Sequence, residues 1–278
     1  MLGKCRLCGK RANIVKSHII PKFVYAWLKK SSATGFLRPG DNPNKRVQDG
    51  PSYPLYCAEC EALFSKYENL FAKKIFYPHM VGKCKTIDYL DDVKRFIIGI
   101  SWRFLDLCMS DFHTLESGVT IPKNNAHEEW RNYLLNRISV CTPGIYLNLL
   151  SDSPNAANEQ TKLLWYSYRG TDAALFIPSS KGMFVYIQLP KITIIVSVFP
   201  APTGNVVDTQ PSSGEMIDLN SPTLRDDFAD FVISRVNILN EGNPSEEHLE
   251  KVRRTIRKNR GRFKKSETSK YLSEEYLK

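Results

Sequence analysis

The sequence lacks the features that place a chain in or across a membrane. It contains no run of eighteen apolar residues, so we expect no membrane-spanning segment and no membrane partner. Its first residues, Met-Leu-Gly-Lys-Cys-Arg, do not form the apolar stretch of a secretory signal. Cysteine is also scarce, and seven residues, four of them in two close pairs and three scattered, suit a reducing cytoplasm better than a disulfide framework. We therefore expect a cytoplasmic protein.

The sequence also lacks internal repeats and a glycine-rich phosphate-binding loop, which leaves solenoid and P-loop folds without support. What it has in excess is positive charge. Its 278 residues include 39 Lys and Arg against 29 Asp and Glu, giving a net charge of +10. Such an excess predicts a polyanionic partner. With 42% hydrophobic residues, the chain can bury one large core or two modest ones.

Two Cys-x-x-Cys pairs carry the strongest signal in the sequence. They are Cys5-Arg6-Leu7-Cys8 and Cys57-Ala58-Glu59-Cys60. Each pair presents two thiolates on a tight turn, and two such turns complete a tetrahedral four-thiolate zinc site. A thioredoxin-like redox role is the weaker interpretation, because neither pair follows a buried strand and opens a long helix. The pattern predicts one structural Zn²⁺.

The segment between the two pairs contains Ser17-His18-Ile19-Ile20-Pro21, which predicts a short strand that ends in a histidine. A helix-forming run with Glu61 and Glu68 on one face follows the second pair. In this order of motifs, residues 3–75 resemble the HNH endonucleases, the zinc-stapled branch of the His-Me finger (ββα-metal) nucleases. The resemblance implies a metal-dependent endonuclease that hydrolyses phosphodiester bonds of DNA or RNA, with His18 as the general base.

The resemblance also implies a catalytic Mg²⁺ or Mn²⁺, and here the sequence departs from the family pattern. Ser17 stands where the family often has Asp or His, and Glu61 stands where it often has His or Asn. Because a carboxylate is a good ligand for a hard cation, we predict Glu61 as the metal ligand, with Glu68 as a second candidate. The family's middle asparagine has no clear match, and the candidates are Asn42, Asn44 and Asp49.

The rest of the chain predicts an α+β protein. We expect helices over 22–28, 58–77 (closed by Pro78), 91–112, 126–140 and 221–239. Between 31 and 54 we expect a loop with a strand only at 36–38. Five runs rich in β-branched and aromatic residues predict an antiparallel sheet, at 146–150, 162–168, 173–178, 183–189 and 192–199. These elements suggest a zinc-bound treble-clef or ββα-metal module at 1–85, a mixed helical and antiparallel β domain at 86–243, and a basic helical tail at 244–278.

The tail begins as a helix capped by Ser245 and then becomes strongly basic. Residues 251–265 contain nine Lys and Arg and no acidic residue. Such a block is either a solvated tail or a nucleic-acid-binding arm, and we favour the arm. The predicted nucleic-acid contacts are Arg253, Arg254, Arg257, Lys258, Arg260 and Arg262.

Two functional hypotheses follow from the sequence. The first is the HNH-like nuclease, which by resemblance would serve in bacterial antiviral defence or in mobile elements, with a protein partner from a defence or toxin system. The second is a non-catalytic zinc treble clef that binds nucleic acid or a protein. The histidine before Ile-Ile-Pro and the acidic helix behind it favour the nuclease, since a zinc staple alone needs neither.

Overall fold

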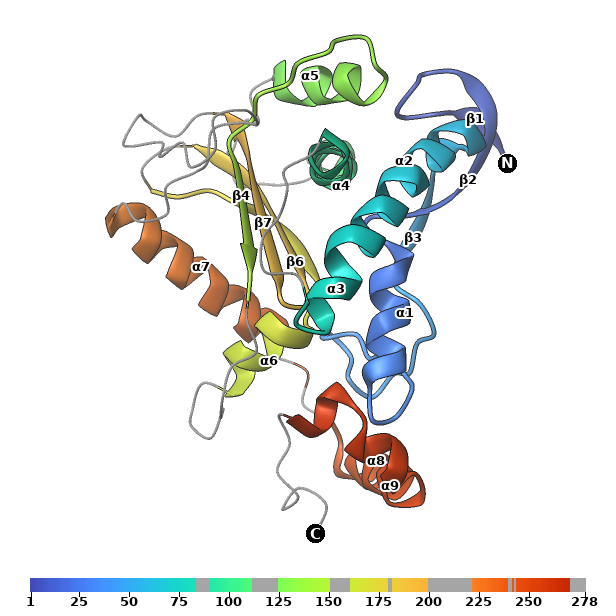
Figure 1. Ribbon diagram of the computed structural model, residues 1–278, viewed down its shortest axis with the longest axis vertical. Coiled ribbons are helices and arrows are strands. Elements are labelled where there is room, and N and C mark those ends of the chain that lie inside the picture. Colours follow the sequence, from blue (N-terminus) through green and yellow to red (C-terminus); the bar gives the residue numbers. More distant parts are fainter. Residues whose placement is uncertain are drawn as a thin grey trace.

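The computed structural model describes residues 1–83, 91–111, 125–150, 161–179, 182–199, 222–239, 242 and 244–270. It confirms the α+β class: one antiparallel sheet has three strands, another has four, and helices surround both (Figure 1). Within the described residues, no helix is long and apolar enough to cross a lipid bilayer. The predicted domain boundaries near residues 85 and 243 fall outside these residues, and the treble-clef assignment stays a prediction.

The N-terminal sheet has the order β1 (Leu2–Lys4), β2 (Arg11–His18) and β3 (Ser52–Cys57). Strand β2 ends at His18 as predicted, and α1 (Lys22–Ser31) starts directly after Pro21. The prediction of a loop through residue 54 was wrong, because β3 already begins at Ser52. Pro54 is tolerated there since β3 pairs only with β2, so its missing N–H falls on an edge strand.

Helix α2 (Ala58–Phe71) follows β3 immediately and runs through the π-helical segment η1 (Ala72–Phe76) into α3 (Tyr77–Met80). The expectation that Pro78 closes this helix was wrong. Pro78 lies in the first turn of α3, where its fixed φ is compatible with the helix and its missing N–H costs little. The chain thus runs from the first Cys-x-x-Cys turn through β2, α1 and β3 to the second turn, where α2 begins.

Helix α4 (Asp91–Asp111) lies at the centre of the molecule, between α2 and the second sheet (Figure 1). The Phe71 and Phe96 rings stack with centroids 3.9 Å apart. About two helical turns away, the Phe64 and Trp102 rings stack with centroids 6.5 Å apart. Helix α5 (Asn125–Leu134) packs on α4 and is shorter than predicted. It ends early because Asn136 adopts a left-handed backbone conformation with φ 57°, which an α-helix cannot continue through.

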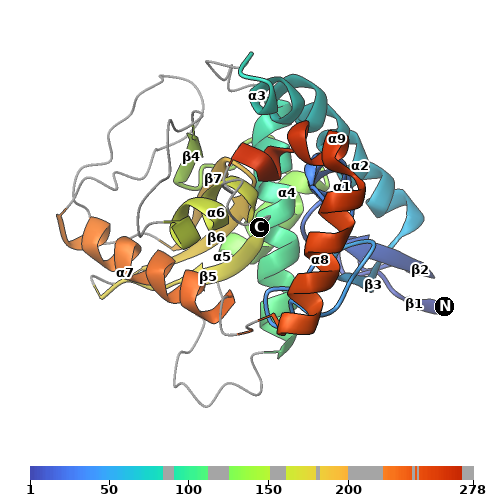
Figure 2. The same cartoon turned by 90° about the horizontal axis from the view of Figure 1, so that it is seen from below.

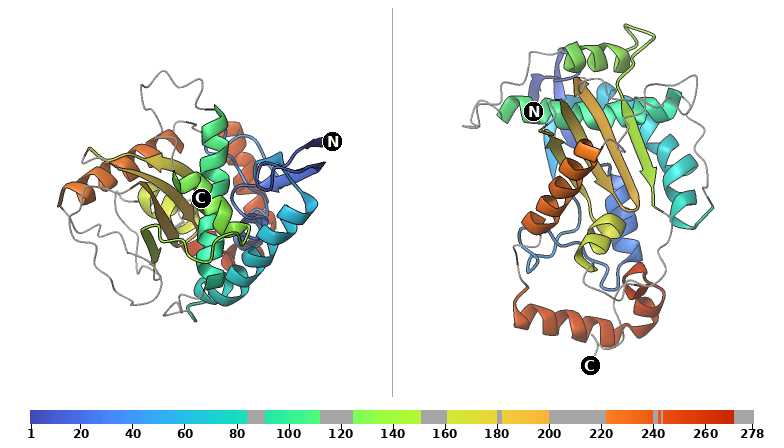
Figure 3. Two further views of the ribbon diagram at one scale, coloured as in Figure 1. Left: turned by 90° about the horizontal axis from the view of Figure 1, so that it is seen from above. Right: turned by 90° about the vertical axis from the view of Figure 1, so that its left-hand side faces the viewer.

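The second sheet has the order β4-β7-β6-β5, with β4 (Ile145–Leu149), β5 (Asp172–Phe176), β6 (Met183–Leu189) and β7 (Ile192–Phe199). Alternate residues of β6 face opposite sides: Val185 joins the core around α4, whereas Tyr186 joins a second cluster. The second cluster lies against α7 (Pro222–Leu239), which covers the other face of the sheet (Figures 1 and 3). Because both faces are covered, β6 is buried along its whole length.

One predicted strand is a helix. Residues 162–168 belong to α6 (Thr161–Arg169), although their leucines and aromatics suggested a strand. A short apolar run fits the periodicity of a helix as well as that of a strand, so tertiary contacts decide between the two. Tyr166 donates to Asp172 of the second sheet and Arg169 donates to the Leu28 carbonyl of α1, so partners that are distant in sequence hold this run in place.

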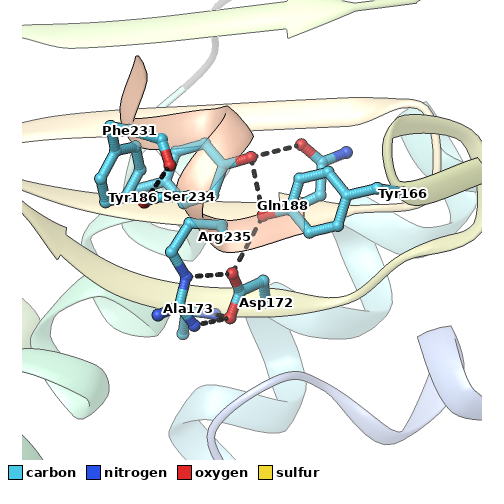
Figure 4. A network of polar contacts seen from close by, with 8 residues as sticks. All are labelled: Tyr166, Asp172, Ala173, Tyr186, Gln188, Phe231, Ser234 and Arg235. Carbon is cyan, nitrogen blue, oxygen red and sulfur yellow. Dashed lines mark hydrogen bonds and ion pairs between the residues drawn. The ribbon is translucent and has the colours of Figure 1, made fainter. Parts of the chain in front are cut away.

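A buried polar network joins α6, α7 and the sheet (Figure 4). The Asp172 carboxylate accepts two hydrogen bonds from Arg235, at 2.7 and 2.8 Å, and one from the Tyr166 hydroxyl at 2.9 Å. The Tyr166 and Tyr186 hydroxyls lie 3.1 Å apart, and Tyr186 donates to Gln188 Oε1. The network therefore fixes how α7 lies on the sheet.

The C-terminal segment forms α8 (Glu246–Lys258), α9 (Arg260–Lys264) and the 3₁₀ turn η3 (Glu267–Lys270). Ser245 caps α8 as predicted, because its Oγ accepts a hydrogen bond from the His248 N–H. The helices lie across α1 and the loop that follows it (Figure 2), where Ala33, Ile256 and Phe263 form a small apolar cluster. In residues 244–270 the tail is thus a docked element with its own apolar contacts.

Candidate zinc centre and neighbouring carboxylate site

The four predicted cysteines come together. Cys5, Cys8, Cys57 and Cys60 place their sulfurs within 4.8 Å of one another. The Cys8 and Cys57 sulfurs are 3.9 Å apart, close to the separation of about 3.8 Å that a tetrahedral site with 2.3 Å zinc–sulfur bonds requires. The structure therefore supports the predicted structural zinc site at the level of ligand geometry, and sequence spacing was sufficient to find it.

Ionisation of the thiols is uneven across the cluster. Burial would raise the pKa of Cys5, but backbone N–H groups, led by that of Cys8, stabilise the thiolate and lower the pKa to about 7. Burial and the neighbouring sulfurs raise the pKa of Cys60 far above its ordinary value. A bound divalent cation would offset the cost of ionising Cys60, since coordination deprotonates thiols. Metal binding is thereby coupled to folding.

Side chains from α4 and α5 hold the first Cys-x-x-Cys turn. Arg6 Nε lies 2.7 Å from Asp106 Oδ2, and the other Asp106 carboxylate oxygen lies 3.1 Å from His127 Nε2. Arg131 Nε donates to the Leu7 carbonyl. The turn is therefore anchored to the central helices as well as to any bound metal.

His18 lies at the end of β2, opposite the start of β3, the strand that leads into the second Cys-x-x-Cys turn. Its side chain is 18% exposed, and its Nε2 is 3.4 Å from Asp49 Oδ2. Lys22 Nζ is 3.8 Å from the same carboxylate oxygen. A proton on Nε2 faces Asp49, so this contact favours the tautomer in which Nδ1 is free to accept a proton.

Glu61 lies in the first turn of α2, close to His18 and Ser17. Burial raises the pKa of its carboxyl, while the Ser17 hydroxyl and the charges of Arg103 and His18 act in the opposite direction. Glu61 Oε2 and Ser17 Oγ are both buried, and although the Ser17 hydroxyl is near enough to stabilise the Glu61 carboxylate, neither atom has a well-formed hydrogen bond to a described residue. Ser17 is fully buried. An unpaired carboxylate oxygen in such a place is unusual and points to a missing cation or donor.

Glu68, the second predicted ligand, has a different neighbour. Arg103 of α4 is 1% exposed and donates from Nη2 to Glu68 Oε1 at 2.6 Å. From Nη1 it donates to the His18 carbonyl at 2.8 Å. Arg103 thus links the His18 strand end to the acidic face of α2. The sequence analysis did not assign Arg103 to the site, although an arginine within the apolar run of residues 96–105 was a usable signal.

The three candidates for the middle position of the motif have distinct places. Asp49 contacts His18, as described. Asn44 accepts a hydrogen bond from the Ser245 N–H at 2.9 Å and so holds the start of α8. Asn42 lines a cavity beside this loop. Only Asp49 is brought to the histidine.

The predicted nucleic-acid contacts of the tail fall into two groups. Arg253 and Arg257 form ion pairs within α8, with Glu246 or Glu250. Arg262 donates from Nε to the Ser32 carbonyl at 3.1 Å and from Nη2 to the Lys29 carbonyl at 2.9 Å, so it caps the C-terminal end of α1. A second group, Arg254, Lys258 and Arg260, is exposed and makes no ion pair among the described residues. The exposed group is therefore the better candidate for phosphate contacts.

Taken together, the geometry gives a four-cysteine cluster and, next to it, a histidine, an unpaired buried carboxylate and a buried arginine. His18 comes from the end of one strand, Glu61 from the first turn of a helix, and Arg103 from the central helix. Comparisons with protein families, with curated proteins and with solved structures find no match for this chain.

Proposed function

We propose that this protein is a metal-dependent nuclease that hydrolyses phosphodiester bonds of DNA, with residues 1–83 carrying the reaction. The observation that carries the proposal is that His18, at the end of β2, lies near enough to the buried Glu61 carboxylate, in the first turn of α2, to act on its charge. A zinc staple requires neither group. The resemblance of residues 3–75 to HNH endonucleases agrees with these positions, and the net charge of +10 suits a nucleic-acid substrate.

In this proposal His18 is the general base. Asp49 holds the imidazole so that Nδ1 can take a proton from the attacking water. Arg103 fixes the backbone at the strand end through the His18 carbonyl, so the ring is carried by a rigid support. An imidazole is suited to this role at neutral pH, because its ordinary pKa lies close to 7.

The residues present also fit a hard divalent cation. Glu61 supplies a buried carboxylate oxygen with no other partner in the described chain, and its Ser17 neighbour supplies a second oxygen. A bound Mg²⁺ or Mn²⁺ would neutralise charge that develops on the phosphate and the leaving oxygen. Glu68 is the weaker ligand candidate, because its carboxylate already pairs with Arg103.

The alternative is a zinc module that binds nucleic acid or a protein without cleaving it. One observation favours it: the Arg103 guanidinium is buried close enough to Glu61 to lower the pKa of that carboxyl. A fixed guanidinium can offset acidic charge without any metal. Under this alternative the site is a structural cluster, and no divalent cation acts on it.

Incubation of the purified protein with supercoiled plasmid and with single-stranded DNA or RNA, in Mg²⁺ or Mn²⁺, separates the two functions. The nuclease predicts cleavage that falls by about 10²–10⁴ in His18→Ala while zinc content and DNA affinity stay near those of wild type. Glu61→Gln should raise the Mg²⁺ concentration needed for half-maximal cleavage, because a neutral amide binds a hard cation less well.

Glu59→Gln is the matched control, since Glu59 lies two residues away in the same turn but its side chain is 83% exposed. It should cleave like wild type at every Mg²⁺ concentration. Equal cleavage by His18→Ala would place the base elsewhere or reveal a contaminant. If wild type cleaves neither DNA nor RNA, the binding module is the correct function.

A further inference from the structure

A cavity of about 1120 Å³ lies beside the His18 site, between the loop of residues 32–53, helix α6 and helix α8. Its volume is slightly above the usual range of small-molecule and cofactor sites, about 300–1,000 Å³. Asp49, the neighbour of His18, forms part of the wall. The cavity is therefore adjacent to the proposed catalytic histidine but is built mostly from other residues.

Arg38 gives this cavity an unsatisfied cationic group. Its Nε donates to His248 Nε2 at 3.0 Å and its Nη1 donates to Thr34 Oγ1 at 3.2 Å. Its Nη2 is buried without a hydrogen-bond partner, and no carboxylate pairs with Arg38 among the described residues. Burial and the nearby charge of Arg46 lower the pKa of Arg38, so the guanidinium lies in an environment that lacks a counter-ion.

The partners of Arg38 line the same cavity, because Thr34 and His248 are both part of its wall. A hydroxyl and a guanidinium side by side form a donor set that matches phosphate oxygens. The neighbouring charges of Lys45 and Arg46 add to the positive potential. An anion is therefore the ligand that this end of the cavity favours.

Aromatic side chains form another part of the wall. Trp165 of α6 is 38% exposed and Tyr53 of β3 is 37% exposed, and both residues line the cavity. The Arg169 guanidinium lies over the Trp165 ring, 5.7 Å from its centroid, so the ring surface left open on Trp165 and that of Tyr53 are the surfaces suited to stack on a planar base. The cavity thus combines a phosphate-binding group with stacking surfaces.

We propose that this cavity binds a nucleoside phosphate, with the phosphate on Arg38 and Thr34 and the base against Trp165 or Tyr53. The ligand has two possible sources. It is either a free mononucleotide or one nucleotide of a single strand that extends from the His18 site, and only the second source rests on the proposed nuclease function. In both cases the recognition chemistry is the same.

Isothermal titration at low salt tests the proposal, with AMP, GMP, CMP and UMP, with adenosine, with inorganic phosphate and with a hexadeoxynucleotide as separate probes. We expect a nucleotide to bind more tightly than either adenosine or phosphate, because each of these fills half of the site. Arg38→Gln should weaken binding of the nucleotide by about tenfold to a hundredfold, the usual loss for a hydrogen bond to a charged group. Arg46→Gln is the matched control, since it removes the same charge from the same loop but from outside the cavity wall, and it should weaken binding much less than Arg38→Gln does.

Because Arg38 also contacts His248, its replacement can loosen α8, and two further variants keep the test decisive. Arg38→Lys retains the charge and should recover part of the affinity. Trp165→Leu should weaken nucleotide binding while leaving phosphate binding near that of wild type. Thermal melts of each variant verify the fold.

Binding of mononucleotides identifies a free ligand, and binding of the oligonucleotide alone identifies a strand subsite; both outcomes support the proposal. Absence of binding for every nucleotide probe overturns it, as does an equal loss of affinity in Arg46→Gln and Arg38→Gln. His18→Ala should bind these probes like wild type, so the result does not depend on whether the protein cleaves nucleic acid.

Discussion

Replacing Asp172 by asparagine tests how far the sheet depends on the network of Figure 4. Asp172 is 8% exposed, and its carboxylate accepts three side-chain hydrogen bonds, two from Arg235 and one from Tyr166. Asparagine has nearly the same volume, so the substitution removes the charge and one acceptor without creating a cavity. Arg235 then keeps its charge with no counter-ion in this place.

The expected loss follows from the burial of the two partners. Removal of one partner from a fully buried ion pair costs about 3–5 kcal/mol. The Arg235 side chain is 23% exposed and can be partly hydrated, whereas that of Asp172 is only 7% exposed. We therefore expect Asp172→Asn to lower the free energy of unfolding by about 2–3 kcal/mol, below the fully buried range. That corresponds to a fall in melting temperature of about 4–12 °C for a chain of this size.

Urea denaturation followed by tryptophan fluorescence measures this change, with Asp227→Asn as the control. Asp227 lies on α7, the helix that carries Arg235, and its carboxylate accepts hydrogen bonds from Ser179 in an exposed position. Its replacement should therefore lower the free energy of unfolding by less than about 1 kcal/mol. The double variant Asp172→Asn with Arg235→Met should regain part of the loss, because it removes the unpaired charge. Equal stabilities of Asp172→Asn and Asp227→Asn would refute the assigned role of the network.

Three further predictions concern the metal, the tail and pH. Cys57→Ser, or removal of zinc with a chelator, should unfold the N-terminal unit, because thiolate coordination supplies on the order of 10 kcal/mol to a small zinc site; metal content below one zinc per chain in the wild-type protein would contradict this. Changing Arg254 and Lys258 together to glutamine should reduce the slope of log affinity for DNA against log salt by about 2, measured by fluorescence anisotropy, and an unchanged slope would show that α8 makes no phosphate contact. Burial and nearby cations lower the pKa of His248 below its usual 6.5, so the unfolded state binds its proton first and stability should fall as the pH drops below about 6.5. Protease release of the tail between about pH 7.5 and 5.5 should reveal this loss, and His248→Gln, which keeps an acceptor for Arg38, should abolish the pH dependence.

The local features of the candidate site could be predicted from the sequence because they depend on short-range patterns. The spacing of Cys5, Cys8, Cys57 and Cys60 anticipated the sulfur cluster, and the proline after His18-Ile-Ile anticipated the end of β2. The positions of Glu61 and of the Ser245 cap also follow from local rules. Whether the site is catalytic stays a prediction.

The features that sequence reasoning missed depend on distant partners. Residues 162–168 form a helix because Tyr166 and Arg169 find partners on the sheet and on α1, which no local period reveals. Strand β3 contains Pro54, which is acceptable only on an edge. Arg103 pairs with Glu68, 35 residues earlier in the chain, and although an arginine in an apolar run is a signal, the pattern of neither segment identifies its partner.

The cap on α1 has a consequence for how the chain folds. Two arginines satisfy carbonyl groups at the end of this helix: Arg169 binds the Leu28 carbonyl, 141 positions earlier in the chain, and Arg262 binds the Lys29 carbonyl, 233 positions earlier. Contacts between such distant residues form late, since a long loop must close before they gain anything. The zinc turns need only the first sixty residues, whereas the helix that starts four residues after His18 is capped only when nearly the whole chain has been made. We therefore expect the metal site to be in place during synthesis and the C-terminal end of α1, the helix that follows His18, to be capped last.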